Sequence, residues 1–196
     1  MAVDGYMYFV PYVGNPLASE SQVDTTTHPT SEPLFTQFNF GTMATGKNLF
    51  EIEDFSFDIE QTLNIGSQST GAGAGKVTFN PFSINRKIDI SSPTLFQMAC
   101  SGTPFKQVTL GLRKSSGGQT SGQIFLVFNF KLVAVKTIAW SYDDESPKEA
   151  MTFEYGGLQV FYSQQKPDGS MLTPIPSGWN RVKNIQDDQP TSNLIQ

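Results

Sequence analysis

The run QIFLVFNFKLVAVKTI, residues 123–138, decides the fold class. Its first part, residues 124–128, is apolar on both faces, which is typical of a central strand covered on either side. Most other dense segments alternate apolar and polar residues with period two, the pattern of half-buried strands. Tyr6, Tyr8, Val10 and Tyr12 mark such a strand near the start of the chain, with Phe9 on its other face. The prediction is a mainly β domain of antiparallel strands.

Further strands follow from the same period. They are centred on residues 50–65, 77–88, 108–112, 151–162 and 175–185. The apolar parity switches around Asn80-Pro81 and again across Gly156-Gly157, and both steps predict β-bulges or, at the proline, an edge. Seven or eight strands with one short helix predict a barrel or a sandwich.

One short helix is predicted over about residues 92–101. Ser91 or Ser92 can cap its N-terminus, and Pro93 suits the first turn. Leu95, Met98 and Ala99 recur at helical spacing, and a glycine at 102 is a typical C-terminal stop.

Composition excludes several classes of protein. The 196 residues suit one ordinary domain, and the net charge of −5 argues against a nucleic-acid binder, which needs a basic surface. The longest apolar stretch, residues 124–128, is far short of the roughly 20 residues that span a bilayer. The start lacks the basic and apolar regions of a cleavable signal peptide, so none is predicted. One cysteine, Cys100, leaves no internal disulfide.

No catalytic or metal site is predicted. The glycine-rich run before Lys76 has Thr70 and Val77 where a phosphate-binding loop would need glycine and Ser or Thr. The single histidine, His28, lies in a polar loop with no base or nucleophile partner at a meaningful spacing. Cysteine and histidine together total two, too few for zinc without carboxylates. The acidic run at residues 143–145 is interpreted as a solvated turn, with a weak cation site as the alternative.

Six segments, in order, resemble the haemolysin-coregulated protein (Hcp) family of bacterial type VI secretion. They are MAVD at residues 1–4, GAGAGKV at 71–77, RKIDISSPTLFQMACSG at 86–102, VTLGLRK at 108–114, VFYSQQKPDG at 160–169 and GWN at 178–180. Their spacing matches the family from about residue 47 to 184. The resemblance implies a β-barrel with one helix on its flank.

The resemblance also implies a function. Members of the family form hexameric rings that stack into the inner tube of a contractile injector in Gram-negative bacteria. The tube is built in the cytoplasm and expelled, and small effector proteins can ride in its lumen. The implied partners are other copies of the chain, the sheath, spike and baseplate proteins, and effectors; no enzyme activity, cofactor, nucleic acid or membrane insertion is expected. A closed ring needs two different faces of each subunit to meet.

The resemblance assigns contact residues to one loop. The long loop at about residues 64–75 reaches a neighbouring ring or subunit in the family, and its small residues permit close backbone approach. The residues expected to make that contact are Asn64, Gly66, Ser67, Gly71, Gly73 and Gly75.

Two segments depart from the family pattern. The barrel domain is predicted to occupy residues 1–185, with an insertion in its first loop at about 24–46, and a polar tail follows at 186–196. The insertion carries Leu34, Phe35, Phe38 and Phe40. The main hypothesis is therefore a structural conduit. The alternative is a specialised effector or accessory protein that uses the insertion as its interaction surface.

Overall fold

The computed structural model describes residues 3–21, 48–64, 73–114, 123–142 and 146–188. Within these ranges one helix, α3 (Ser92–Ser101), accompanies the strands. The strands are β1 (Val3–Pro11), β2 (Phe50–Ile52), β3 (Asp54–Ser56), β4 (Ile59–Asn64), β5 (Gly73–Phe79), β6 (Phe82–Lys87), β7 (Phe105–Lys114), β8 (Gln123–Tyr142), β9 (Pro147–Tyr162), β10 (Ile175–Asn180) and β11 (Ile185–Gln186). The predicted fold class, mainly β with one short helix, is confirmed.

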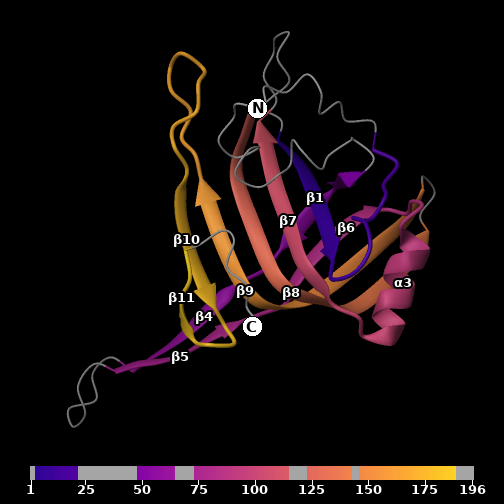
Figure 1. The fold of residues 1–196 in the computed structure, drawn as a ribbon, viewed down its shortest axis with the longest axis horizontal. Coiled ribbons are helices and arrows are strands. Elements are labelled where there is room, and N and C mark those ends of the chain that lie inside the picture. Colours follow the sequence, from indigo (N-terminus) through magenta and orange to yellow (C-terminus); the bar gives the residue numbers. More distant parts are fainter. Residues whose placement is uncertain (1–2, 22–47, 65–72, 115–122, 143–145, 189–196) are drawn as a thin grey trace.

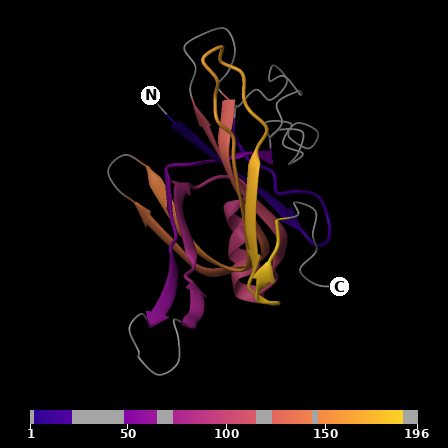
Figure 2. The same ribbon diagram turned by 90° about the vertical axis from the view of Figure 1, so that its left-hand side faces the viewer.

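The strands form a nine-stranded sheet and a separate hairpin. The main path of the sheet is β11-β10-β9-β8-β7-β1-β2, and β6 joins β9 to β3 off this path. Every pair is antiparallel, and β4 pairs only with β5. The sheet rolls around its core, as Figure 2 shows from the side of β10.

The predicted barrel is rolled, but its ladder of strand pairs is not closed. β1 pairs with β2, whereas β6 pairs with β3, so the ring is interrupted between β2 and β3. A backbone hydrogen bond lies at the gap, where the Glu53 N–H donates to the carbonyl oxygen of Asn85 at 2.8 Å. The roll is therefore closed by the short chain connection between β2 and β3, and not by pairing between these two strands.

The long pair β8–β9 bends where the sequence changes parity. Phe130 and Leu158 belong to the core on one side of the bend, and Val133 and Tyr155 on the other. The prediction of a bulge at Gly156-Gly157 was wrong, because the register runs unbroken from Lys131–Gly157 to Val133–Tyr155. Both strands kink together instead, and Leu132 takes a positive φ of 49°.

This bend gives β9 two sets of neighbours. Residues 148–153 of β9 pair with β6, and residues 157–162 pair with β10. The other predicted bulge, at Asn80-Pro81, is a break between two strands, because proline cannot donate to the ladder. The β8–β9 pair thus spans the molecule from the β10–β11 edge to the side that α3 covers (Figure 1).

Phenylalanine rings fill the inside of the roll. Phe82 stacks on Phe130, with ring centroids 4.1 Å apart, and on Phe153 at 4.7 Å. Phe9 meets Phe50 edge to face at 5.1 Å. Fully burying such side chains contributes about 1.5–3 kcal/mol each, so these rings are the main source of stability.

The helix begins and ends where the sequence predicts. Pro93 lies in the first turn, and Gly102 forms the C-cap with φ 66°. Ser91 is the N-cap residue, but its hydroxyl makes no capping hydrogen bond. It donates to Asp89 at 2.6 Å and accepts from Arg86 at 3.0 Å. No helix in the described ranges is long and apolar enough to cross a membrane.

Several predicted features lie outside the described residues: His28, the insertion at about 24–46, and the acidic run 143–145. The last predicted strand is two strands, β10 and β11, joined by a turn. Residues past the predicted domain end still contact the sheet, since the Asp187 N–H donates to the Gly178 carbonyl oxygen at 3.0 Å. The domain boundaries at 185 and 24–46 stay predictions.

Candidate assembly surfaces

The contact residues expected from the sequence map to the β4–β5 hairpin. Asn64 pairs with Gly73 at the far end of the hairpin, and Gly75 lies further along β5. Gly66, Ser67 and Gly71 fall outside the described residues. Three of the six predicted positions thus lie in strands, in a hairpin that projects from the body (Figure 1).

Hydrogen bonds anchor the hairpin at its base. The Asn80 backbone N–H donates to the Asp58 carbonyl oxygen at 3.1 Å, and the Asn80 side-chain amide donates to the Asp58 carboxylate at 2.6 Å. Phe79 adds an apolar contact as a member of the core. A two-stranded hairpin without a third strand is marginally stable by itself. The position of the hairpin therefore depends on the contacts at its base and on any further partner of its projecting strands.

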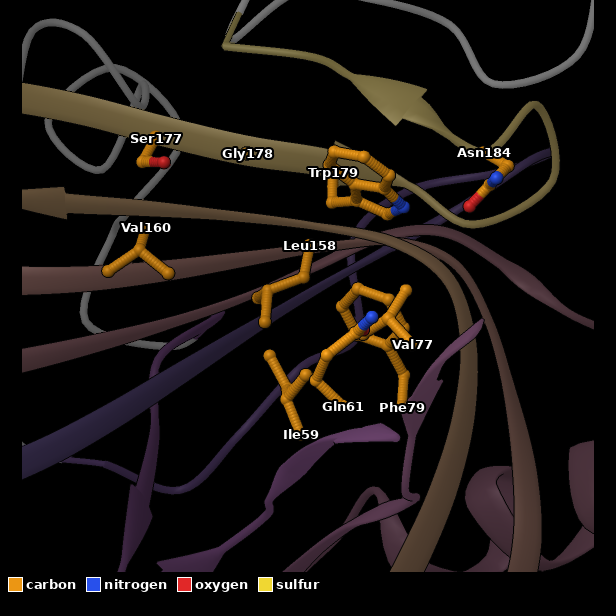
Figure 3. Close-up of a pocket in the computed structure, with 10 residues that line it drawn as sticks. All are labelled: Ile59, Gln61, Val77, Phe79, Leu158, Val160, Ser177, Gly178, Trp179 and Asn184. Atoms are coloured by element: carbon orange, nitrogen blue, oxygen red, sulfur yellow. The ribbon is translucent and has the colours of Figure 1, made fainter. Parts of the chain in front are cut away.

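A groove separates the hairpin from β9 and β10, and we call it the hairpin groove. It consists of two adjoining cavities of about 510 and 660 Å³. Figure 3 shows the first, with side chains from all three elements facing one space. Both cavities are lined by Val77, Phe79, Trp179 and Asn184. The walls of the first cavity are mainly apolar, which is typical of a binding surface, and those of the second are about equally polar and apolar.

Buried hydrogen-bond donors lie beside one end of the hairpin groove. Tyr155 and Arg181 line the second cavity together with Trp179. Neither the Tyr155 hydroxyl nor the Trp179 indole nitrogen has a hydrogen-bond partner among the described residues. Burial raises the pKa of Tyr155 to about 12, so its hydroxyl keeps its proton. Both donor atoms are buried, so neither is accessible at the groove surface.

Arg181 makes this end of the groove cationic. Its guanidinium lies 4.8 Å from the ring centroid of Tyr155 and 5.4 Å from that of Phe79. Glu154 is 3.7 Å away, a long ion pair that is partly exposed. Lys183 follows two residues later, exposed on the same turn.

A second surface lies at the α3 end, and we call it the aromatic patch: Phe96, Trp140 and Tyr142. The rings of Phe96 and Trp140 are 5.5 Å apart. Their exposed fractions are 46% and 51%, and that of Tyr142 is 76%. Exposed aromatic side chains grouped in this way are typical of protein–protein interfaces.

The buried ion pair between Arg86 and Glu149 supports Trp140, one residue of the aromatic patch. The Arg86 Nε donates to Glu149 at 2.7 Å, and the other oxygen of Glu149 accepts from the Trp140 indole at 2.7 Å. Arg86 also donates to the hydroxyls of Ser91 and Ser92 at the start of α3. β6, β8, β9 and α3 are thus tied together, and the Trp140 ring is held in one orientation.

Sequence reasoning missed this ion pair, although the signal was present. Phe82, Ile84 and Arg86 alternate along β6 and are all buried. A charged residue at the parity of the core indicates a buried charge, which needs an opposite charge nearby. Its partner Glu149 comes 63 residues later, a distance that no local pattern spans.

The described residues hold no cluster of three or more metal-ligating side chains. Cys100 is exposed on α3. The expectation that the protein carries no cofactor or catalytic site stays a prediction.

The amino-acid sequence is similar to those of known Hcp proteins. Residues 41–162, well over half of the chain, match the family model described as "Type VI secretion system effector, Hcp". The curated protein Hcp1 of Pseudomonas aeruginosa is 32% identical over 112 residues, which cover 57% of this chain and 69% of that protein.

Solved structures share the fold. A structure titled as a type six secretion system protein superposes with a TM-score of 0.72 at 20% identity, covering 95% of this chain and all of that one. Hcp1 from Salmonella typhimurium gives a TM-score of 0.65 at 20% identity, with the same coverage. The family predicted from the sequence is thereby confirmed: the chain belongs to the Hcp family and is a tube subunit of the type VI secretion system.

Proposed function

We propose that the chain forms homo-hexameric rings that stack into the inner tube. The observation that carries this proposal is the placement of two unlike surfaces. In Figure 1 β10 and the β4–β5 hairpin, which line the groove, lie on the side opposite α3, which carries Phe96 of the aromatic patch. A head-to-tail ring needs this arrangement, because each copy offers one face to one neighbour and a different face to the other.

The β4–β5 hairpin supplies the contact along the tube axis in this proposal. Its strands project from the body beyond the anchored base, which supports a contact between their far end and a neighbouring ring. Asn64, Gly73 and Gly75 lie towards that tip. The absence of side chains at the glycines permits two backbones to approach closely.

The tube assembles in the cytoplasm and leaves the cell with its load through the type VI secretion system. Sheath, spike and baseplate proteins are its partners outside the ring, and effectors travel in the lumen. The work is geometric, and we propose no catalytic activity. The native mass of the purified protein, with negative-stain images of the same sample, tests the ring: six-fold rings support it, and a stable monomer contradicts it.

The alternative function, an accessory protein that uses the insertion, has one supporting observation. The segments on either side of it are joined by hydrogen bonds. Ser19 donates to the Leu49 carbonyl oxygen at 2.7 Å, and Asn48 donates to that of Leu17 at 2.9 Å. The described residues on either side of the insertion therefore lie next to each other, which is compatible with an added segment between them.

Deletion of residues 24–46 distinguishes the two functions. With the base held by these hydrogen bonds, the deleted protein is expected to fold. Unchanged rings and unchanged secretion would favour the conduit alone. Rings that form but no longer support secretion of a partner would favour the accessory function.

A further inference from the structure

A row of polar side chains crosses the face of the sheet opposite the phenylalanine core. The strand register places Thr109 on β7 opposite Asn129 on β8, and Asn129 opposite Gln159 on β9. The neighbours Leu110 and Phe130 belong to the core, so the row lies on the other face of the strands. All three polar residues are at most 2% exposed. Buried polar groups cost free energy unless they are hydrogen-bonded, so the row needs partners.

The row is joined by hydrogen bonds that all run in one direction. The Gln107 amide donates to the Thr109 hydroxyl at 3.0 Å, and that hydroxyl donates to Asn129 at 3.2 Å. The Asn129 amide donates to Gln159 at 3.2 Å, and the Gln159 amide donates to the backbone carbonyl oxygen of Asp187 at 3.2 Å. Successive hydrogen bonds polarise one another, so the row acts as a unit. It ties the segment that contains Asp187 to β7, β8 and β9.

That segment, residues 185–188, lies along the outer edge of β10, and we call it the strap. Its first part is β11, which pairs with the end of β10 (Figure 1). The Asp187 N–H donates to the Gly178 carbonyl oxygen at 3.0 Å, and the Gly178 N–H donates to the Asp188 carboxylate at 2.8 Å. The Asp188 side chain thus takes the place that a strand carbonyl would occupy in a longer ladder.

The strap closes an edge of the sheet. Backbone groups alternate between the two sides of a strand, so Pro176, Gly178 and Asn180 all point towards the strap side of β10. Proline has no N–H to offer, and the other two residues are paired with the strap. An unprotected edge strand is a template for pairing with another chain. The strap and the proline together remove that template.

Polar contacts rather than apolar burial hold the strap. Ile185 and Gln186 are both exposed, Ile185 with an exposed fraction of 51%. The turn that joins the strap to β10 contains Asn184 at φ 54°, a conformation that asparagine tolerates better than most residues. Segments with few buried apolar contacts open at a lower free energy than the rest of a fold. The strap can therefore open about this turn while the sheet stays folded.

We propose that the strap is a removable closure of the β10 edge, and that the polar row through Gln159 sets how firmly it is held. When the strap opens, the backbone groups of Gly178 and Asn180 become available. The same edge of a second opened copy can then pair with them. Such a contact is two-fold and isologous, unlike the head-to-tail contacts of the proposed ring. The closed strap keeps this competing strand pairing out of assembly.

The experiment weakens the strap from either side in the full chain. Asp188→Ala removes the acceptor of the Gly178 N–H, and Gln159→Leu removes the donor to the Asp187 carbonyl oxygen. Asp188→Asn is the conservative control, because its amide oxygen can still accept from Gly178. Gln97→Leu is the matched control for Gln159→Leu, since Gln97 is an exposed residue of α3. Circular dichroism and thermal unfolding check that all four variants fold, and Asp188→Ala alone carries the test if Gln159→Leu fails.

Hydrogen exchange followed by mass spectrometry measures the opening of the strap. Peptides that contain Gly178 and Asp187 should exchange about tenfold faster in Asp188→Ala and Gln159→Leu than in the wild type, because one hydrogen bond of the strap is lost. Peptides of β6 and α3 should exchange as in the wild type. The two control variants should match the wild type throughout. Unchanged exchange in the weakened variants would overturn the strap.

Native mass spectrometry of the same samples measures the use of the opened edge. The two weakened variants should form assemblies of twice the wild-type mass at concentrations where the wild type and both controls do not. Faster exchange with an unchanged mass would overturn the role of the strap as a closure of the edge. Because each mass is compared with that of the wild type, the result does not depend on whether the wild type is a ring or a monomer.

Discussion

The α3 end and the hairpin end of the molecule share the β8–β9 pair but are held by different contacts. At the α3 end, Arg86 and Glu149 are almost wholly buried and join four elements through directed hydrogen bonds. At the hairpin end, the nearest ion pairs, Lys136–Glu154 and Arg181–Glu154, are partly exposed, and a groove separates the strands. The comparison teaches that the α3 end is held together by directed contacts within one chain, whereas the hairpin end leaves an open groove between its strands.

The largest expected effect comes from breaking the buried pair. Glu149→Ala removes the carboxylate that pairs with the Arg86 Nε and leaves the buried guanidinium paired with Asp89 at 3.1 Å, so the expected loss is at most about 3–5 kcal/mol in the free energy of unfolding. Urea denaturation monitored by circular dichroism measures it. Lys136→Ala is the control at the hairpin end, where an exposed pair contributes at most about 1 kcal/mol. Equal losses in the two variants would remove the distinction between the ends.

A smaller effect is expected at Gly178, where the chain returns along β10. A Cβ at this position would lie 2.1 Å from the carbonyl oxygen of Asp187. Gly178→Ala should therefore displace residues 185–188 at a cost of about 1–3 kcal/mol. Hydrogen exchange is the measurement: amides of residues 178–188 should lose protection while those of β6 and α3 keep theirs. Ser177→Ala, on the adjacent exposed residue, is the control.

Substitutions in the hairpin are expected to affect assembly more than folding. Gly73→Val and Gly75→Val add side chains to a strand, where valine is favoured, so the free energy of unfolding should change by less than about 1 kcal/mol. Stacking should weaken, because the new side chains keep a neighbouring backbone away. Filament formation by purified rings under crowding, followed by electron microscopy, tests this. Filaments as abundant as those of the wild type would exclude the glycines as a contact.

Sequence reasoning succeeded where the physical cause is local. The helix over residues 92–101 follows from Pro93, Gly102 and the spacing of Leu95 and Met98, all within one short segment. The strands follow from period two, which reports burial on one face. The change of parity near Gly156 also located the bend, although its form needed the opposite strand, where Leu132 takes the strained conformation.

Sequence reasoning did not find the features that are formed by segments far apart in the chain. The hairpin groove combines Ile59, Leu158 and Trp179 from three parts of the chain. Ile59 continues the period-two spacing of Phe55 and Phe57, which pack on the core, but β4 pairs with β5 and not with the main sheet. Nothing in the local sequence distinguishes an apolar residue that fills a core from one that faces a groove.

The smallest expected effect is confined to alkaline pH and concerns the buried tyrosine at the hairpin end. Burial raises the pKa of Tyr155 to about 12, from an ordinary value near 10. Between these values the unfolded chain loses the proton and the folded chain keeps it, so stability falls as pH rises from about 10 to 12 and is unaffected by this group below 10. Tyr155→Phe keeps the ring and removes the titration. Urea midpoints at pH 9 and pH 11.5 should therefore differ less in the variant than in the wild type, and an unchanged difference would show that the hydroxyl ionises freely in the folded protein. Because Tyr8, whose pKa burial also raises to about 12, is unaltered in the variant, part of the slope should persist.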